Sequence, residues 1–289
     1  MIYVICNPTA GNGRSEKTGA LIDKTLTGRK IEHEYLLTAA PGHATTLAAQ
    51  AAQKGAQAIL AVGGDGTVLE VARGLLGTQT ALGVIPAGTG NDFIKTIGTP
   101  KDPLKALDAA LLYKPRPTDA VRLNDRIFLN ETGTGFDVMV LSYAAKAKKY
   151  CHGLLPYLYG VLCTIFHYSH VHVSYALDGG ETVERDILVL GAGNGRYIGG
   201  GIPIAPEATP DDGLLDVVVI KGMKKSRMLH VLPLLLKGKV LTFPETEFVR
   251  AKALTLSGKG MRLNIDGEIC PIERADISIM PGKLLVLRP

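Results

Sequence analysis

The sequence predicts a two-domain protein of the α/β plus all-β class, and three observations support this. The chain has 289 residues, a comfortable length for two domains. Strand and helix patterns alternate in the first third, which indicates a parallel sheet covered by helices. Beyond Lys114–Pro117 strands follow strands, and Asp178-Gly179 and Asp266-Gly267 are hairpin signals, which favours a β-sandwich.

The elements of the first domain follow from short apolar runs and helical periodicity. The predicted strands are Ile2–Cys6, Ile31–Thr38, Ala58–Val62 and Ala81–Ile85. The predicted helices are Ser15–Leu26 with Ser15 as its cap, His43–Lys54, Thr67–Leu76, and a helix from Asp102-Pro103 to Leu112.

The second domain is predicted to be mainly β. Its expected strands are Ala120–Leu123, Arg126–Asn130, Val171–Leu177, Thr182–Leu190, Arg262–Ile265 and Glu268–Ile272. Its expected helices are Tyr143–Phe166 and Lys224–Lys237. The domains would therefore comprise residues 1–118 and 119–279, and residues 280–289, which contain the strand Leu284–Leu287, could return to the first.

Composition excludes several classes of protein. The net charge of +5 suits an anionic ligand or membrane surface, but without tryptophan or a basic stripe it does not indicate nucleic-acid binding. Cys6, Cys151, Cys163 and Cys270 are widely spaced, which favours a reducing cytoplasm. No signal peptide is evident, and the longest apolar stretch, Leu154–Tyr168, is too short for a membrane span. We expect a cytoplasmic protein that is soluble or peripheral to the membrane.

Three polar, glycine-rich loops follow predicted strands of the first domain. They are Asn7–Gly13, Gly63–Thr67 and Pro86–Phe93. Parallel strands end at one edge of a sheet, so these loops could line one nucleotide site, where glycines let backbone N–H groups approach phosphate. Asp65 would then need a Mg²⁺ ion or a hydroxyl beside it, while Thr89 and Asn91 can bond a phosphate or a base. Each loop alone could also be a plain turn, and neither a P-loop nor a Rossmann fingerprint is present.

These segments resemble the bacterial soluble diacylglycerol kinase and lipid kinase family, which is related to sphingosine kinases and NAD kinases. The resemblance continues in Gly193-Asn194, Gly199–Gly201, Pro206–Ala208 and Asp211–Asp216. It implies a Rossmann-like, NAD-kinase-like nucleotide-binding domain followed by a β-sandwich domain.

The resemblance also implies binding residues. The ATP site would comprise Asn7, Thr38, Gly63, Gly64, Asp65, Gly66, Thr67, Val68, Leu69, Thr89 and Asn91. A structural Mg²⁺ would be held by Asp212 and the carbonyl oxygens of Thr209 and Leu214. Without the resemblance, the Asp-Asp-Gly segment would be a hairpin turn with no metal.

The Asp266-Gly267-Glu268 turn would carry the catalytic base. A lipid alcohol becomes a good nucleophile only as its proton leaves, and a positioned carboxylate can accept that proton. One of Asp266 and Glu268 would do so while the other orients it, and family usage favours Glu268. Asp65 would help Mg²⁺ offset charge during transfer. The alternative is an ordinary Asp-Gly hairpin.

Two further features allow more than one interpretation. His170 and His172 share a face of a predicted strand and, near His167, could bind zinc, although a solvated strand face explains them as well. Leu154–Phe166 could be a core helix or a wall for an acyl chain. The preceding Lys146, Lys148 and Lys149 suit an anionic bilayer or a solvated face.

The sequence therefore predicts a membrane-peripheral, ATP- and Mg²⁺-dependent kinase that phosphorylates a lipid such as diacylglycerol, with the headgroup in the inter-domain cleft. Phosphatidylglycerol, a sphingoid base or an undecaprenyl-like alcohol remain alternative lipids. A kinase of a non-lipid alcohol such as NAD, or a non-catalytic nucleotide sensor, are the alternative functions. The expected partner is the lipid substrate at the membrane surface, and a homodimer is compatible with the family.

Overall fold

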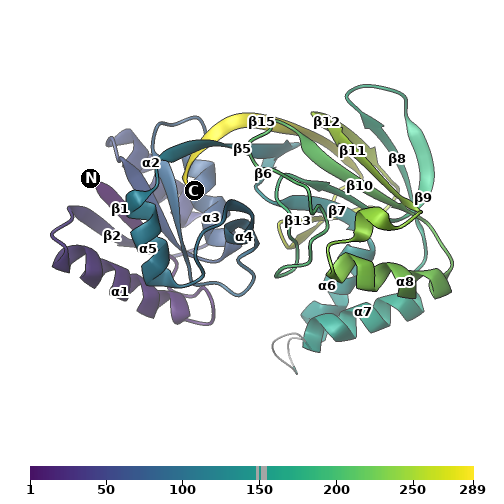
Figure 1. The fold of residues 1–289 in the computed structure, drawn as a ribbon, viewed down its shortest axis with the longest axis horizontal. Coiled ribbons are helices and arrows are strands. Elements are labelled where there is room, and N and C mark those ends of the chain that lie inside the picture. The colour runs from purple at the N-terminus through teal and green to yellow at the C-terminus, as the bar shows by residue number, and fades with distance from the viewer. Residues whose placement is uncertain (148–149, 151–154) are drawn as a thin grey trace. The chain divides into compact units, whose positions relative to one another are not determined.

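The computed structural model describes residues 1–147, 150 and 155–289, and the chain forms two compact units (Figure 1). Unit 1 contains Met1–Ala120, Pro210–Asp212 and Met280–Pro289. Unit 2 contains Val121–Thr209 and Gly213–Ile279. Among the described residues, no helix has the length and apolar character needed to cross a membrane.

Unit 1 is built on a parallel sheet, as the alternating pattern predicts. Its strands are β1 (Ile2–Cys6), β2 (His33–Leu37), β3 (Ala58–Gly63), β4 (Ala81–Pro86) and the end of β15 (Arg274–Leu287). The order is β15-β4-β3-β1-β2. Every residue of β3 and β4 is buried, as is typical of parallel strands covered on both faces.

The helices of unit 1 are α1 (Arg14–Gly28), α2 (His43–Gln53), α3 (Asp65–Leu75), α4 (Asp92–Ile97) and α5 (Pro103–Leu112). Asp102 caps α5 as predicted, accepting from the Lys105 backbone N–H at 2.9 Å. The prediction that Ser15 caps α1 is wrong. Gly13 is the N-cap at φ 81°, and the buried Ser15 hydroxyl instead donates to the Val62 carbonyl at 3.0 Å.

Unit 2 is a β-sandwich whose strands pair antiparallel. Its strands are β5 (Pro115–Leu123), β6 (Arg126–Phe128), β7 (Glu131–Gly135), β8 (Val171–Leu177), β9 (Val183–Gly193), β10 (Leu215–Lys221), β11 (Thr246–Ala251), β12 (Ala253–Ser257), β13 (Arg262–Ile265), β14 (Glu268–Pro271) and the first part of β15. The predicted turns at Asn124, Asp178 and Asp266 are confirmed, with positive φ of 53°, 50° and 47°. β15 pairs with β12 in unit 2 and with β4 in unit 1.

Three helices, α6 (Phe136–Ala147), α7 (Leu155–His167) and α8 (Lys225–Leu236), lie on one side of the unit 2 sheet, and η1 (Val240–Thr242) follows α8 (Figure 1). The prediction of one helix over Tyr143–Phe166 is wrong, because Tyr150, between α6 and α7, lies in a turn. Residues 148–149 and 151–154 of that prediction lie outside the described residues. Val218 of β10 packs toward the helices and its neighbour Val217 toward the sandwich core, so β10 is apolar on both faces.

Candidate active site

The three glycine-rich loops of unit 1 pack together, backbone against backbone. A Cβ atom on Gly88 would lie 2.3 Å from the Gly64 Cα, and one on Gly11 would lie 2.1 Å from the Ala87 carbonyl oxygen. No side chain fits at such distances, so glycine is required at these contacts. The loop after β4 therefore contacts both the loop after β1 and the loop after β3.

Side-chain hydrogen bonds hold these loops to one another. The Asn7 amide Nδ2 donates to Thr67 Oγ1 at 3.2 Å. The Phe93 backbone N–H donates to Asp65 Oδ1 at 3.1 Å, at the start of α4. Burial raises the pKa of Asp65 above its usual value, and the hydrogen bond from the Phe93 N–H partly offsets this increase. Asp65 thus positions the Asn91–Phe93 backbone in addition to any contact with a ligand.

The start of α3 has the features of a phosphate site. Its N-cap residue, Gly64, has an extended backbone and no side chain. The first N–H groups of α3 therefore receive no hydrogen bond acceptor from the N-cap residue's side chain. Gly66 and Thr89 are exposed beside it, whereas Thr67 and Val68 are buried. The structure thus brings together the predicted ATP residues of three loops. The Val68 N–H already donates to the Gly64 carbonyl at 3.1 Å, so the N–H groups of α3 that could contact a nucleotide are those that precede Val68.

Two further predicted ATP residues lie along the same edge of the sheet. Thr38 directly follows β2, and its N–H donates to the Cys6 carbonyl at the end of β1, at 2.9 Å. The Asn91 amide donates to the Gly88 carbonyl at 3.1 Å and has a φ of 52°. Asn91 therefore shapes its own loop, a role that the sequence pattern does not distinguish from ligand binding.

In unit 2 the acid turn between β13 and β14 gives its two carboxylates different surroundings. Asp266 Oδ2 accepts from the Leu129 N–H at 2.8 Å, and Oδ1 accepts from the N–H groups of Asn130 and Glu131 at 3.0 and 2.9 Å. Glu268 is exposed, and its carboxylate makes no hydrogen bond with the described residues. Asp266 therefore fixes the turn, whereas the Glu268 carboxylate faces solvent.

A polar chain lies beneath this turn. The Gly267 N–H donates to Asn264 Oδ1 at 2.9 Å, and Asn264 Nδ2 donates to Asp137 Oδ2 at 3.3 Å. A carboxylate only accepts hydrogen bonds, so Asp137 orients the amide of the fully buried Asn264. Both residues escape sequence analysis, because their contact joins α6 to β13 across more than a hundred residues.

The predicted metal segment offers oxygen donors of the kind that Mg²⁺ prefers. Asp212 is exposed, while Asp211 is bound by the Arg288 guanidinium at 2.5 Å. Among the described residues no three His, Cys, Asp or Glu side chains group to hold a metal. A site at Asp212 would therefore depend on carbonyl oxygens such as those of Thr209 and Leu214, and a carboxylate with carbonyls suits a hard cation.

Comparisons with known proteins cover the whole chain. Residues 1–123 match the diacylglycerol kinase catalytic domain, and residues 130–288 match the YegS C-terminal NAD kinase beta sandwich-like domain. The diacylglycerol kinase of Mycobacterium tuberculosis is 32% identical over 295 residues, covering 100% of this chain and 95% of that protein. The chain belongs to the diacylglycerol kinase family. It is accordingly a kinase, a phosphotransferase with an alcohol acceptor.

Two other relatives agree with this assignment. A protein of Pseudomonas putida named as a YegS-like lipid kinase is 37% identical over 242 residues, covering 82% of this chain and 78% of that protein. A solved structure from Bacillus anthracis, described as a diacylglycerol kinase candidate, is 27% identical with a TM-score of 0.79, covering 100% of this chain and 97% of that one. The predicted family and fold class are thereby confirmed.

The kinase also has a basic residue among its loops that the sequence analysis missed. Arg14 Nε donates to the Gly11 carbonyl at 3.0 Å, and Nη2 contacts the Gly88 carbonyl at 3.5 Å. Its guanidinium is exposed and could offset phosphate charge. A signal existed, because a cation in the first turn of a helix opposes the helix dipole and needs another reason to be there.

We expect Asp137 to give the kinase a distinct pH dependence of stability. Its Oδ1 is buried without a hydrogen bond from the described residues, and this burial raises the pKa of Asp137 to about 6. In the unfolded chain the pKa of an aspartate is about 3.9, so between about pH 4 and 6 the folded protein binds more protons at Asp137 than the unfolded chain does. The contribution of Asp137 to the free energy of unfolding therefore falls as the pH rises through that window.

Asp137→Asn is expected to remove that fall in stability. Urea unfolding of both proteins between about pH 4 and pH 7 measures it, and the free energy of unfolding should decline less steeply with pH in the variant. Parallel curves for the two proteins would show that Asp137 titrates normally.

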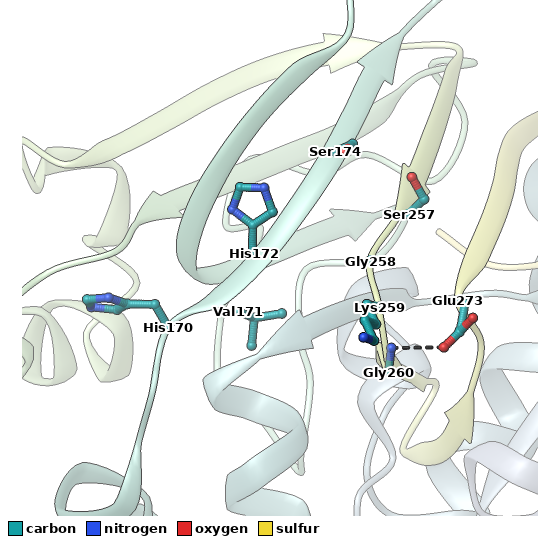
Figure 2. Close-up of a pocket in the computed structure, with 9 residues that line it drawn as sticks. All are labelled: His170, Val171, His172, Ser174, Ser257, Gly258, Lys259, Gly260 and Glu273. Atoms are coloured by element: carbon teal, nitrogen blue, oxygen red, sulfur yellow. Dashed lines mark hydrogen bonds between the residues drawn. The ribbon is translucent and has the colours of Figure 1, made fainter.

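The histidines of unit 2 have separate partners. His170 Nε2 hydrogen-bonds the Met223 carbonyl at 2.8 Å, and His172 Nδ1 lies 2.9 Å from Asp186 Oδ1. Figure 2 shows both side chains at a hollow that Lys259 and Glu273 also line, with the two rings well separated. This arrangement favours the alternative of a solvated strand face over the zinc site.

Proposed function

We propose that this kinase transfers the γ-phosphoryl group of ATP to the hydroxyl of a lipid such as diacylglycerol, giving a phosphatidate. The observation that carries the proposal is the acid turn, where Asp266 is held by three backbone N–H groups and Glu268 is exposed. Such a pair provides one fixed carboxylate and one that can accept a proton. The similarity to the diacylglycerol kinase of Mycobacterium tuberculosis supports diacylglycerol as the acceptor.

ATP is proposed to bind at the loops of unit 1. The N–H groups at the start of α3 would bind phosphate oxygens, and Gly66, where a Cβ meets no protein atom, leaves room for close approach. Thr38 and Thr89 would provide hydroxyls at the same edge of the sheet. Arg14 would offset the charge of the phosphates from the neighbouring loop.

In the proposed reaction the lipid hydroxyl oxygen forms a bond to the γ-phosphorus, and the bond from that phosphorus to the β–γ bridging oxygen breaks. Glu268 accepts the hydroxyl proton, and ADP leaves. Asp266, Asn264 and Asp137 hold the turn that carries Glu268, so that it meets the hydroxyl without reorganisation. Asp212, with the carbonyl oxygens of Thr209 and Leu214, would hold a Mg²⁺ ion, which when bound supplies positive charge and structural support.

The substrate class places the reaction at a membrane surface. A long-chain diacylglycerol remains in the bilayer, so we propose a cytoplasmic enzyme that associates peripherally with the membrane. A homodimer is compatible with this arrangement.

Transfer of labelled phosphate from ATP, with Mg²⁺, to lipids in mixed micelles tests the function. Diacylglycerol, phosphatidylglycerol and a sphingoid base serve as acceptors beside NAD, and labelled phosphatidate is the expected product. Label on another lipid or on NAD would reassign the substrate. ATP binding without transfer would favour a nucleotide sensor.

Gly66→Ala tests the nucleotide site directly. Its new methyl group meets nothing within 4 Å, so the variant should fold normally. A bound phosphate would be displaced, and we expect ATP affinity to fall at least about tenfold, or about 1.4 kcal/mol. Gly28→Ala, at an equally open position in α1, is the matched control. Unchanged ATP affinity in Gly66→Ala, measured by calorimetry, would place the nucleotide elsewhere.

A further inference from the structure

Helix α7 exposes one continuous apolar face in unit 2, hereafter the α7 face. Its members recur at i, i+3, i+4, i+7 and i+11, which places them on one side of a helix. They are Leu155, Leu158, Tyr159, Leu162 and Phe166, with 60%, 54%, 50%, 50% and 73% of their surfaces exposed. Five large apolar side chains on one helix face exceed the scattered exposure that is normal for a soluble protein.

The opposite side of α7 is used for packing, so the helix cannot turn its apolar face inward. A Cβ on Gly160 would lie 2.5 Å from the Val140 carbonyl oxygen of α6. Thr164 and Ile165 are buried, and Ile165 belongs to the apolar core beneath the helices. Figure 1 shows α7 as the outermost of the three helices, away from the sheet.

The two helices α7 and α8 carry basic side chains and no acidic ones, although Glu245, outside them, pairs with Arg227 of α8. The sequence has no Asp or Glu at positions 138–177 or 217–244, which contain α7 and α8. Lys225 Nζ donates to the Phe166 carbonyl at 2.5 Å, so the start of α8 lies against the end of α7. Lys224, Lys237 and Lys239 flank α8, are exposed and form no ion pair with the described residues. Leu229 and Leu236 of α8 add exposed apolar surface.

The combination of basic charge and apolar surface indicates which partner would cover the α7 face. In a two-fold contact between copies the same patch faces itself, so these lysines, which have no ion-pair partner among the described residues, would approach one another. An anionic bilayer instead offers negative headgroups to the lysines and an apolar layer to the side chains. We propose that the α7 face, with the lysines flanking α8, docks the kinase on anionic lipid bilayers. This inference rests on the proposed function, because it supplies the route to a lipid substrate.

Vesicle co-sedimentation of the full chain, without ATP, tests the docking. The probes are vesicles of phosphatidylcholine with and without an equal part of phosphatidylglycerol. We expect binding to the mixed vesicles that weakens at high salt, and a loss of at least tenfold in Phe166→Glu and Leu158→Glu. Leu112→Glu, at an 82% exposed leucine of α5, is the matched control and should bind as the wild type does. Thermal melting of each variant confirms folding.

The outcomes separate docking from catalysis. Equal vesicle binding by the wild type and both α7 variants, or no binding by the wild type, would overturn the proposal. A wild-type dimer that Phe166→Glu converts to a monomer, with vesicle binding unchanged, would overturn it in favour of a second copy. Turnover of a short-chain diacylglycerol, dissolved as a monomer, measures the proposed reaction in the absence of a bilayer. Its absence in the wild type would count against the reaction, while docking is judged by vesicle binding.

Discussion

Glu268→Gln is expected to lower kcat by roughly 10²- to 10⁴-fold, the usual contribution of a positioned general base, and to leave ATP affinity unchanged. Glutamine keeps the shape of the side chain but cannot accept the hydroxyl proton. The Glu268 carboxylate makes no hydrogen bond with the described residues, so its replacement should not destabilise the fold. Steady-state kinetics with a lipid acceptor and calorimetric titration with ATP give the two readouts.

Two comparison variants make this test specific. Glu181→Gln removes the charge of another exposed glutamate of unit 2 and should retain the wild-type kcat. Asp266→Asn replaces a carboxylate that accepts three backbone N–H bonds, so its loss should appear in stability, by about 2–4 kcal/mol in urea unfolding. Wild-type kcat in Glu268→Gln would remove Glu268 from the reaction and return the role of base to Asp266.

The turn also shows what sequence reasoning can and cannot separate. An Asp-Gly pair between two strand-like runs is a strong local signal, and the structure has a turn there with Asp266 at a φ of 47°. Nothing local distinguishes the two acids, because the N–H groups that hold Asp266 come from Leu129, Asn130 and Glu131. Only the folded chain brings these distant segments together.

Unit 1 was largely predictable because its signals are local. Buried parallel strands are continuous apolar runs, and β1 (Ile2–Cys6) begins and ends where predicted. Loops rich in glycine follow β1, β3 and β4, and strand direction alone places them at one edge. The six-residue α4 was missed, because so short a helix has too few turns to show a periodic pattern.

The helices of unit 2 were harder to predict, since the stretch from Tyr143 to Phe166 is mostly apolar and its three lysines all lie within Lys146–Lys149. A mostly apolar run does not by itself mark where one helix ends and another begins. The pairing of α6 with α7 through Gly160 depends on a close approach to Val140 that the sequence pattern does not encode. For the same reason, the open α7 face emerges only from the structure.

Asp65→Ala is expected to abolish measurable turnover. The Asp65 carboxylate accepts from the Phe93 N–H, which holds the β4 loop against the β3 loop, and it also supplies negative charge where Mg²⁺·ATP is proposed to bind. Alanine removes both contributions. Asp65→Asn keeps an acceptor for the Phe93 N–H and removes only the charge, so its free energy of unfolding should stay close to that of the wild type.

A control of similar structural role separates chemistry from stability. Asp102 also accepts one backbone N–H at a helix start, from Lys105 at 2.9 Å, and is the N-cap of α5. Asp102→Ala should lose about 1 kcal/mol of stability with wild-type kcat. If Asp65→Asn loses turnover by at least about 100-fold without destabilisation, the carboxylate charge acts in phosphoryl transfer. If Asp65→Asn turns over normally and only Asp65→Ala fails, the role of Asp65 is to hold the two loops together.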